Sequence, residues 1–370
     1  MSRRVAVVGG GAVGATAAHD LAVRGADVTL YEKGKVGGGS TARAAGIAYD
    51  AFAEDIDAAV AARSLDRFRA LAEASRFAFD DTPYLFFATE AGAEVDAIRD
   101  AVERMRDHGR DVETVSASGI RRRFPQLVCE DIHTAAIAEN AGVAEPESYA
   151  ETMAERAAEL GARVREHTSV AVRTDPSRVV IDGEETVYDD VLVAAGAHTR
   201  PLLADAGIEA TLRAYRVQAL RASGPAIPTF YDASAGYYAR PTRRGILAGD
   251  GAESVPSDPD TWDRDADEAF TERTERRLRE RLLNFEGQVK TGWAGLCTAT
   301  PDGDPLLGEL GGLYVAAGWH GHGFMRAPAL GEAIAAEIVG EGGIDAFDPT
   351  RFSGDEEFRI REGMTLGDSG

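Results

Sequence analysis

Near its N-terminus the sequence reads Gly9-Gly10-Gly11-Ala12-Val13-Gly14, between an apolar run, Val5 to Val8, and an alanine-rich stretch, Ala12 to Arg24. The apolar run predicts a buried parallel strand, and the alanine-rich stretch predicts a helix that ends at Gly25. A second strand is expected over Asp27 to Tyr31. In a strand–helix–strand unit, G-x-G-x-x-G spacing permits a tight turn, close approach of backbone N–H groups to a pyrophosphate, and close packing of the helix. The stretch therefore predicts dinucleotide binding.

An acidic residue follows at the distance that this motif requires. Glu32 ends the second strand, eighteen residues after Gly14, where its carboxylate can accept hydrogen bonds from a ribose hydroxyl. The same carboxylate would repel a 2′-phosphate, which disfavours NADP. The motif alone does not separate FAD from NAD, so that choice depends on the rest of the chain.

Three later segments favour FAD. Residues 38–46, GGSTARAAG, offer hydroxyls and bare backbone to a second part of the cofactor, and residues 191–196, VLVAAG, end a strand in a small-residue turn. Residues 316–324, AAGWHGHGF, precede a helix expected from about Pro328 to Val339. A helix N-terminus stabilises negative charge. A reduced flavin carries such charge around its pyrimidine ring, whereas an NAD enzyme has no use for this arrangement.

These segments and one further strand supply the predicted cofactor-binding residues. No metal site is predicted, because His320 and His322 stand two residues apart in a turn without a nearby carboxylate. We expect His322 to fix this turn against FAD. The predicted cofactor-binding set is Gly9, Gly11, Ala12, Val13, Gly14, Glu32, Lys33, Ser40, Thr41, Arg43, Ala45, Gly46, Val170, Ala195, Gly196, Gly321, His322, Gly323, Phe324 and Met325.

The composition is strongly acidic. Asp and Glu number 62 against 40 Lys and Arg, the formal net charge is −22, and only Lys33, Lys35 and Lys290 are lysines. Such a surface repels nucleic acid and anionic lipid, and its self-repulsion predicts that salt stabilises the fold. The composition resembles that of proteins from salt-loving cytoplasms. A GC-rich genome would explain the preference for arginine but not the excess of acids.

No segment is expected to direct the chain to a membrane. The sequence has no run of about twenty apolar residues to cross a bilayer, and no signal-peptide pattern precedes the first strand. We therefore expect a cytoplasmic protein. The two cysteines, Cys129 and Cys297, are too few for a disulfide framework and lack the spaced partners of a zinc site.

The middle and the end of the chain give weaker patterns. Glu54 to Arg123 has apolar residues at helical spacing, which predicts a helical, solvent-facing segment. Ser254 to Asp267 is expected to be an acidic loop before a helix, and the segment after Phe352 a loosely held tail.

Five segments, taken in order, resemble the D-amino-acid oxidase superfamily: the glycine motif, GSTARAAGI, LVAAGAHT, WAGLCTATPDGDPLLGE and GWHGHGFMRAPALGEAIAAEI. The similarity covers about residues 3 to 340 and is strongest to the branch of sarcosine oxidase, dimethylglycine dehydrogenase and D-amino-acid dehydrogenase. It implies an α/β fold with two domains. A Rossmann-like FAD-binding domain would comprise residues 1–80, 141–210 and 291–345, and an α+β substrate domain with an antiparallel sheet would comprise 81–140 and 211–290, with a tail at 346–370.

The resemblance also implies a reaction. A neutral amine is held over the flavin, a hydride equivalent passes from the carbon bearing nitrogen to the flavin, and the resulting imine hydrolyses. The substrate would be a small amino acid or N-alkylated amine, such as a D-amino acid, glycine or a sarcosine-like compound, and the electron acceptor O₂ or another compound. Alternatives on the same fold are an FAD-dependent 2-hydroxy-acid or glycerol-3-phosphate dehydrogenase and a non-catalytic flavoprotein assembly factor. The oligomeric state is not predicted.

Four positions depart from the pattern of the resembling proteins. The flavin-linking histidine of dimethylglycine dehydrogenase falls on Arg43, and the flavin-linking cysteine of monomeric sarcosine oxidase falls on Gly295, so the resemblance implies non-covalent FAD. A lysine that serves the reaction with oxygen in monomeric sarcosine oxidase falls on Leu247, which leaves a dehydrogenase possible. Cys297 takes a position often held by tyrosine, and its role is open.

Tyr238, Arg240, His320 and Arg326 are predicted to meet the substrate. A substrate carboxylate would be held by Arg240 or Arg326, with Arg43 as the third candidate, because a guanidinium can bind a carboxylate with two hydrogen bonds. In the sarcosine oxidase group a lysine at the position of Met325 binds the carboxylate. Tyr238 shares a strand face with Arg240 and resembles the family's pocket tyrosine. His320 is expected either to contact the substrate and tune its amine pKa or to be structural.

Overall fold

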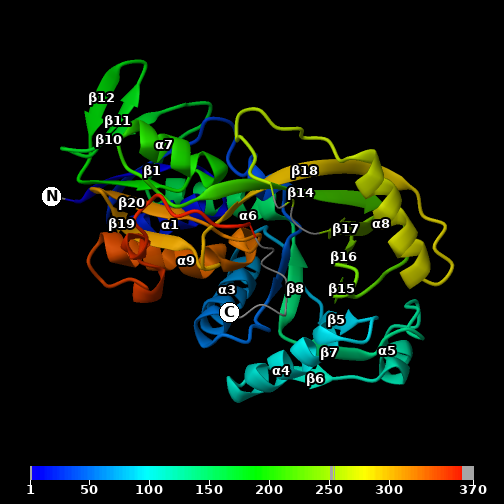
Figure 1. The fold of residues 1–370 in the computed structure, drawn as a ribbon. Coiled ribbons are helices and arrows are strands. Elements are labelled where there is room, and N and C mark those ends of the chain that lie inside the picture. Colours follow the sequence, from blue (N-terminus) through cyan, green and yellow to red (C-terminus); the bar gives the residue numbers. More distant parts are fainter. Residues whose placement is uncertain (1, 251–252, 254, 361–370) are drawn as a thin grey trace.

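The computed structural model describes residues 2–250, 253 and 255–360, and contains two large sheets placed side by side (Figure 1). The first has six strands, all parallel to their neighbours except at one edge, where the last two strands form an antiparallel pair. The spatial order is β19 (Leu306–Leu310), β20 (Leu313–Ala317), β13 (Asp190–Val193), β1 (Arg4–Val8), β2 (Asp27–Tyr31) and β9 (Arg163–Arg165).

Helices cover one face of this sheet, and smaller elements cover the other. Alternate residues of β1 point to opposite faces, so Val5 and Val7 join the core beneath the helices, while Ala6 and Val8 join a second core. The helices are α1 (Ala12–Val23), α6 (Pro146–Glu159) and α9 (Gly323–Ile338), and α3 (Asp55–Ala74) packs on α9. The second core lies beneath β10 (Ala171–Arg173), β11 (Arg178–Ile181), β12 (Glu184–Val187) and α7 (Thr199–Asp205).

The second large sheet has eight strands and is antiparallel except where β15 pairs with β5. Helix α8 (Glu268–Arg281) packs on its outer face through Phe270 and Leu278. The spatial order is β18 (Val289–Ala299), β14 (Arg213–Ala222), β17 (Gly245–Asp250), β16 (Tyr237–Thr242), β15 (Thr229–Asp232), β5 (Tyr84–Ala88), β7 (Thr134–Ala138) and β6 (Val112–Thr114). The predicted fold class, α/β with a largely antiparallel second sheet, is confirmed.

Short elements join the two large sheets. A three-stranded sheet consists of β3 (Ile47–Tyr49), β8 (Ala141–Ala144) and β4 (Phe79–Asp81), and α2 (Ser40–Arg43) packs against β18. The predicted division into discontinuous domains stays a prediction. Both sheets nevertheless draw strands from distant parts of the chain, because β1 pairs with β13 and β15 pairs with β5.

The expectation that residues 54–123 form one helical segment is wrong. Only α3, α4 (Ala93–Asp107) and α5 (Ala117–Arg123) are helical there, and β4, β5 and β6 interrupt them. Strand β5 is buried at all five positions and lies between β15 and β7. Pro83 precedes it, and the aromatic, β-favouring composition of Tyr84–Ala88 outweighs the helical spacing of its neighbours.

Two boundaries differ from expectation in ways that matter later. Helix α9 begins at Gly323, five residues before the expected Pro328, so the end of the glycine- and histidine-rich motif forms its first turn. The described part of the tail is held in place: Ile360 is buried, and the carbonyl of Phe358 accepts a hydrogen bond from Arg213. Residues 361–370 of the predicted tail lie outside the described residues.

A search of the described residues finds no helix that combines the length and the apolar character needed to span a bilayer. The cytoplasmic location and the stabilisation by salt stay predictions.

Candidate active site

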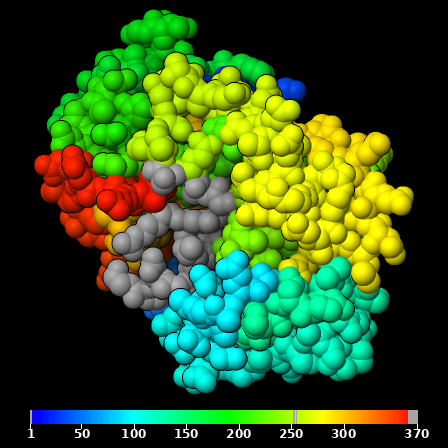
Figure 2. Space-filling model, turned by 45° about the vertical axis from the view of Figure 1, so that its right-hand side comes forward, coloured from blue at the N-terminus to red at the C-terminus, as the bar shows by residue number. Residues whose placement is uncertain are grey.

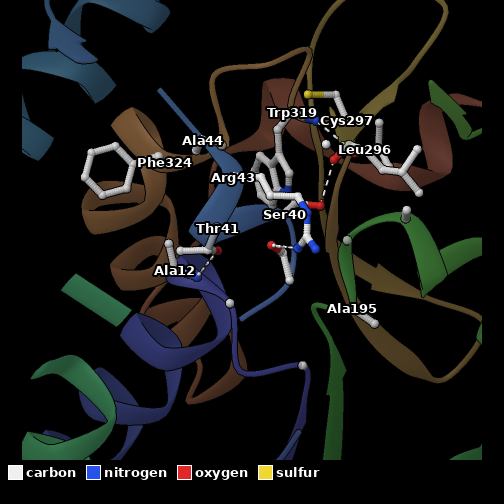
Figure 3. Close-up of a pocket in the computed structure, with 18 of the residues that line it drawn as sticks. Ala12, Ser40, Thr41, Arg43, Ala44, Ala195, Leu296, Cys297, Trp319 and Phe324 are labelled. Carbon is white, nitrogen blue, oxygen red and sulfur yellow. Dashed lines mark hydrogen bonds between the residues drawn. The ribbon is translucent and has the colours of Figure 1, made fainter. Parts of the chain in front are cut away.

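A cavity of about 710 Å³ is lined by residues of both large sheets. Nearly all of the predicted cofactor-binding residues line it, drawn from the start of α1, the end of β2, α2, the end of β13 and the start of α9. Figure 3 labels ten residues of the cavity lining. The exception is Gly14, which lies one turn into α1 behind the lining.

The glycine motif packs so tightly that side chains are excluded. Gly9 has φ +110°, and a Cβ there would lie 2.4 Å from the carbonyl oxygen of Ala194. A Cβ on Gly14 would lie 2.0 Å from the carbonyl oxygen of Gly9. These contacts hold α1 against β1 and β13 and place its N-terminal residues Ala12 and Val13 at the cavity.

Glu32 is fixed at the end of β2 by two backbone hydrogen bonds. Gly10 N donates to its Oε2 and Gly34 N to its Oε1, each at 2.8 Å. A carboxylate has about four lone-pair positions, so Glu32 can still accept from a ribose hydroxyl. Its position in the lining therefore suits the role predicted from the sequence.

Helix α2 ties the dinucleotide motif to the eight-stranded sheet, as the dashed lines in Figure 3 mark. Ala12 N donates to Thr41 Oγ1 at 3.1 Å, and Ser40 Oγ donates to the carbonyl of Leu296 at 2.7 Å. Arg43 Nη1 donates to the carbonyls of Gly38 and Gly39. The segment thereby forms a short bridge along one side of the cavity.

The two positions at which resembling proteins attach flavin meet in this structure. A Cβ built on Gly295 would lie 3.2 Å from Cβ of Arg43, and both residues line the cavity. Trp293 Nε1 donates to the carbonyl of Arg43 at 3.1 Å. Neither a glycine nor a guanidinium offers the thiol or imidazole nucleophile that a covalent link requires.

Acid precipitation is therefore expected to leave all of the yellow colour in the supernatant. The reason is that Arg43 and Gly295 lack a nucleophile for the flavin. The measurement is the absorbance of supernatant and pellet after denaturation in trichloroacetic acid. Flavin retained on a proteolytic peptide from the pellet would contradict the prediction.

The start of α9 places a neutral imidazole beside the cavity. His322 caps the helix and packs edge-on against Phe52, with ring centroids 5.5 Å apart. Burial lowers the pKa of His322 well below its usual range, and the nearby Arg326 charge acts in the same direction. Among the described residues His322 Nε2 has no hydrogen-bond partner, although its atom is buried. A buried nitrogen without a partner, beside a helix N-terminus, suits a site in which the polar edge of a bound ring supplies the missing hydrogen bond.

Aromatic side chains that sequence analysis missed form the wall contributed by the sheets. Tyr49 and Tyr84 stack in parallel with ring centroids 4.2 Å apart, and both line the cavity. Trp319 and Trp293 line it as well. Trp293 and Trp319 lie within motifs that were recognised, so their position in the sequence was a usable signal. Tyr84 was hidden by the wrong helical assignment.

Tyr238 stands in a row with small residues across the second sheet. The row runs from Tyr238 through Gly249 and Ala219 to Trp293 on four adjacent strands. A Cβ on Gly249 would lie 2.3 Å from the Tyr238 hydroxyl, so that hydroxyl rests on the glycine. Tyr238, Ala219 and Trp293 of this row line an aromatic part of the cavity, called the hollow below, whereas Gly249 lies beneath the Tyr238 hydroxyl.

Arg240 shares the Tyr238 face but lies deeper. It is 2% exposed and is not among the described residues that line the cavity. Its guanidinium donates to the carbonyls of Ala45 and Pro241 and forms an ion pair with Glu145 at 3.1 Å. Since Ala45 lines the cavity, Arg240 supports the lining from behind.

Arg326 also lies outside the described lining residues. It is 4% exposed, its Nη2 is 3.0 Å from Asp57 Oδ1, and its guanidinium lies over the Phe52 ring at 5.0 Å. Burial raises the pKa of Asp57, and the Arg326 charge opposes that rise. Of the three candidate arginines, only Arg43 is found in the described lining.

His320 lines the cavity in a constrained backbone conformation with φ +47°. Its Nε2 accepts a hydrogen bond from Thr300 N at 2.8 Å and lies 3.0 Å from Thr300 Oγ1. These contacts direct that nitrogen toward β18 and fix the turn before α9. Cys297 lies in the lining and is the β18 residue paired with Tyr215 of β14. Among the described residues no group of three His, Cys, Asp or Glu side chains could hold a metal ion.

Known proteins with similar sequences and structures include oxidases and dehydrogenases of amino acids and amines. Glycine oxidase from Geobacillus kaustophilus is 30% identical, over 94% of this chain and 96% of its own. A 4-methylaminobutanoate oxidase (formaldehyde-forming) from Paenarthrobacter nicotinovorans is 28% identical over 96% of this chain, which spans 46% of that longer protein. The crystal structure of L-proline dehydrogenase from P. horikoshii superposes with a TM-score of 0.86 at 27% identity, over 95% of this chain and 98% of its own.

The family model described as FAD dependent oxidoreductase (DAO) matches residues 4–337. This match covers both large sheets and every segment that lines the cavity, and it confirms the resemblance inferred from the five motifs. The chain therefore belongs to the DAO family of FAD-dependent oxidoreductases and is an enzyme with FAD as its cofactor.

Proposed function

We propose that this enzyme oxidises the C–N bond of a small amino acid or N-alkylated amine to an imine. Bound FAD would supply the chemistry by accepting a hydride equivalent from the carbon that bears nitrogen. The observation that carries the proposal is one continuous cavity, which joins the dinucleotide motif to an aromatic hollow beside the N-terminus of α9. The similar proteins named above, which act on glycine, 4-methylaminobutanoate and L-proline, support the same reaction class.

The side chains around the hollow would orient the substrate and keep it dry. Tyr238 and Trp293 form opposite walls, and Tyr49 and Tyr84 extend the aromatic surface. An aromatic enclosure holds alkyl groups and favours an amine nitrogen at a ring face, especially while the nitrogen carries charge. Holding the reacting carbon in one orientation is the main contribution that the protein makes to such a reaction.

The placement of the arginines favours an N-alkylated amine over a compact α-amino acid. Arg240 and Arg326 are engaged by Glu145 and Asp57, so a carboxylate would have to displace an existing partner. For a substrate with a carboxylate, Arg43 is our proposed anchor, because it lines the cavity. In our proposal Arg240 positions the segment around Ala45, and His320 fixes the turn that faces the substrate.

Anaerobic reduction of the holoprotein by matched compounds tests the proposal. Pairs should differ only by a carboxylate, such as N-methylalkylamines and the corresponding N-methyl amino acids, beside glycine, proline and D-alanine. We expect amines to bleach the flavin absorbance. The rate of bleaching should depend less on the presence of a carboxylate than on N-alkylation. Bleaching by 2-hydroxy acids or glycerol 3-phosphate alone would replace the proposal with the alcohol-oxidising alternative. No bleaching by any of these classes would contradict the proposal.

A further inference from the structure

A segment that no motif singled out also lines the cavity. Residues 255–267, called the strap below, connect β17 to α8. In Figure 1 the strap is the yellow-green loop that arches over β14 and β18 toward α7. Pro259, Asp260, Trp262 and Arg264 of the strap belong to the cavity lining. The strap thus belongs to the part of the chain that forms the second sheet, and it extends to the cavity that contains the dinucleotide motif.

Both ends of the strap are fixed to the eight-stranded sheet. Ser257 N donates to the carbonyl of Ala214 at 2.8 Å, which continues the pairing of this segment with β14. Ala294 N in β18 donates to the carbonyl of Arg264, also at 2.8 Å. The tip between these two hydrogen bonds is the part that covers the cavity.

Arg216 reinforces both ends from within the sheet. Its side chain is 8% exposed and donates to the carbonyls of Asp263 and Asp265. It also pairs with the carboxylates of Asp267, at 3.0 Å, and Glu253. One buried guanidinium therefore holds residues on both sides of the tip, so both ends of the strap are fixed to the sheet and the tip extends between them.

The tip contacts the dinucleotide-binding side through two sets of side chains. Asp260 Oδ1 lies 3.1 Å from His198 Nε2, and the same nitrogen lies 2.8 Å from Lys33 Nζ. The Trp262 ring centroid lies 5.9 Å from the guanidinium of Arg43, across the cavity lining, and 5.4 Å from that of Arg264, within the strap itself. In Figure 2 the yellow-green residues lie directly against the green ones, as the Asp260–His198 contact requires.

We propose that the strap is part of the FAD-binding site and controls the release of FAD. Lys33 and His198 line the cavity near the ribose acid Glu32, and Arg43 lines it beside Gly295. A cofactor that follows the lining from Glu32 to Gly295 passes beneath the tip, because the tip contacts residues near both places. Release of FAD therefore requires the contacts of Asp260 and Trp262 to break. This inference rests on FAD binding and not on the identity of the substrate.

The test is the rate of FAD release from holoprotein, followed by the fluorescence of freed flavin after dilution. Trp262→Ala removes both cation–π contacts, and we expect release to be five- to thirtyfold faster, equivalent to about 1 to 2 kcal/mol. Trp262→Phe keeps an aromatic face and should stay near the wild-type rate. Val255→Ala is the matched control, because Val255 belongs to the strap, is 66% exposed and is not among the described lining residues.

A second variant avoids any question of folding. The Asp260 side chain is 74% exposed, so Asp260→Asn should leave the fold intact and speed release by up to about fivefold at low salt. Molar KCl should remove this difference, because it screens exposed charges, and should leave the Trp262→Ala effect in place. Unchanged release in both Asp260→Asn and Trp262→Ala would overturn the proposal. So would a Trp262→Ala variant with slower flavin reduction but normal release, since Trp262 would then serve the substrate.

Discussion

Replacing Gly14 by alanine is expected to abolish FAD binding, with the dissociation constant raised at least a hundredfold or no flavin retained on purification. The new Cβ would lie 2.0 Å from the carbonyl oxygen of Gly9, and both atoms belong to backbone segments that cannot rotate away. Helix α1 would have to move off β1. Because Gly9 is held at φ +110° with Ala194 behind it, the turn cannot follow the helix. The N–H groups that face the pyrophosphate would then lose their positions.

The flavin-to-protein absorbance ratio and a titration of apoprotein with FAD measure this effect. Gly34→Ala is the control, since Gly34 lies in the neighbouring loop and its Cβ would make an ordinary contact of 3.7 Å with Glu32. We expect the control to bind FAD like the wild type. A Gly14→Ala variant with full flavin content would show that α1 can shift without loss of the site.

Replacing Arg326 by methionine is expected to destabilise the fold by about 3 to 5 kcal/mol. Arg326 and Asp57 are both buried, at 5% and 15% side-chain exposure, and removal of the guanidinium leaves the Asp57 carboxylate without its compensating charge. Burial already raises the pKa of Asp57 while Arg326 opposes it, so the variant should drive that carboxyl toward its neutral form. Asp304, whose burial raises its pKa to about 6, also loses a stabilising positive charge nearby.

Denaturant unfolding of a double-mutant cycle separates this role from substrate binding. The pair Arg326→Met with Asp57→Leu should be more stable than Arg326→Met alone, because no lone buried charge remains. If the role of Arg326 is structural, the double variant should change kcat/KM by the same factor for amines with and without a carboxylate. A selective loss of ten- to a hundredfold for the carboxylate compounds would instead restore Arg326 as the anchor.

Local sequence was sufficient to predict the dinucleotide half of the fold. The G-x-G-x-x-G turn depends on contacts within one βαβ unit, so Gly9, Gly11 and Glu32 could be placed from spacing alone. Strand β5 could not be placed this way. Its partners β15 and β7 lie in distant parts of the sequence, and these tertiary contacts decide the conformation of a short apolar run.

Substrate-side residues show the same limit at the level of side chains. Alternation along β16 predicted correctly that Tyr238 and Arg240 share a face, but not that Arg240 lies beneath the lining. Its depth depends on Glu145, and that of Arg326 depends on Asp57, through ion pairs between elements far apart in sequence. A sequence with so many arginines gives no sign of which of them already has a buried carboxylate partner.

The pairing of β20 with β13 and the packing of α9 on α1 have a consequence for biosynthesis. Strands β1 and β2 are synthesised before β19 and β20 but belong to the same sheet. In a nascent chain the cofactor cavity therefore stays incomplete until α9 has been synthesised, because His322 and the first residues of α9 form part of its lining. We therefore expect flavin loading to follow synthesis of α9, and a nonsense mutation before Gly323 to yield colourless protein.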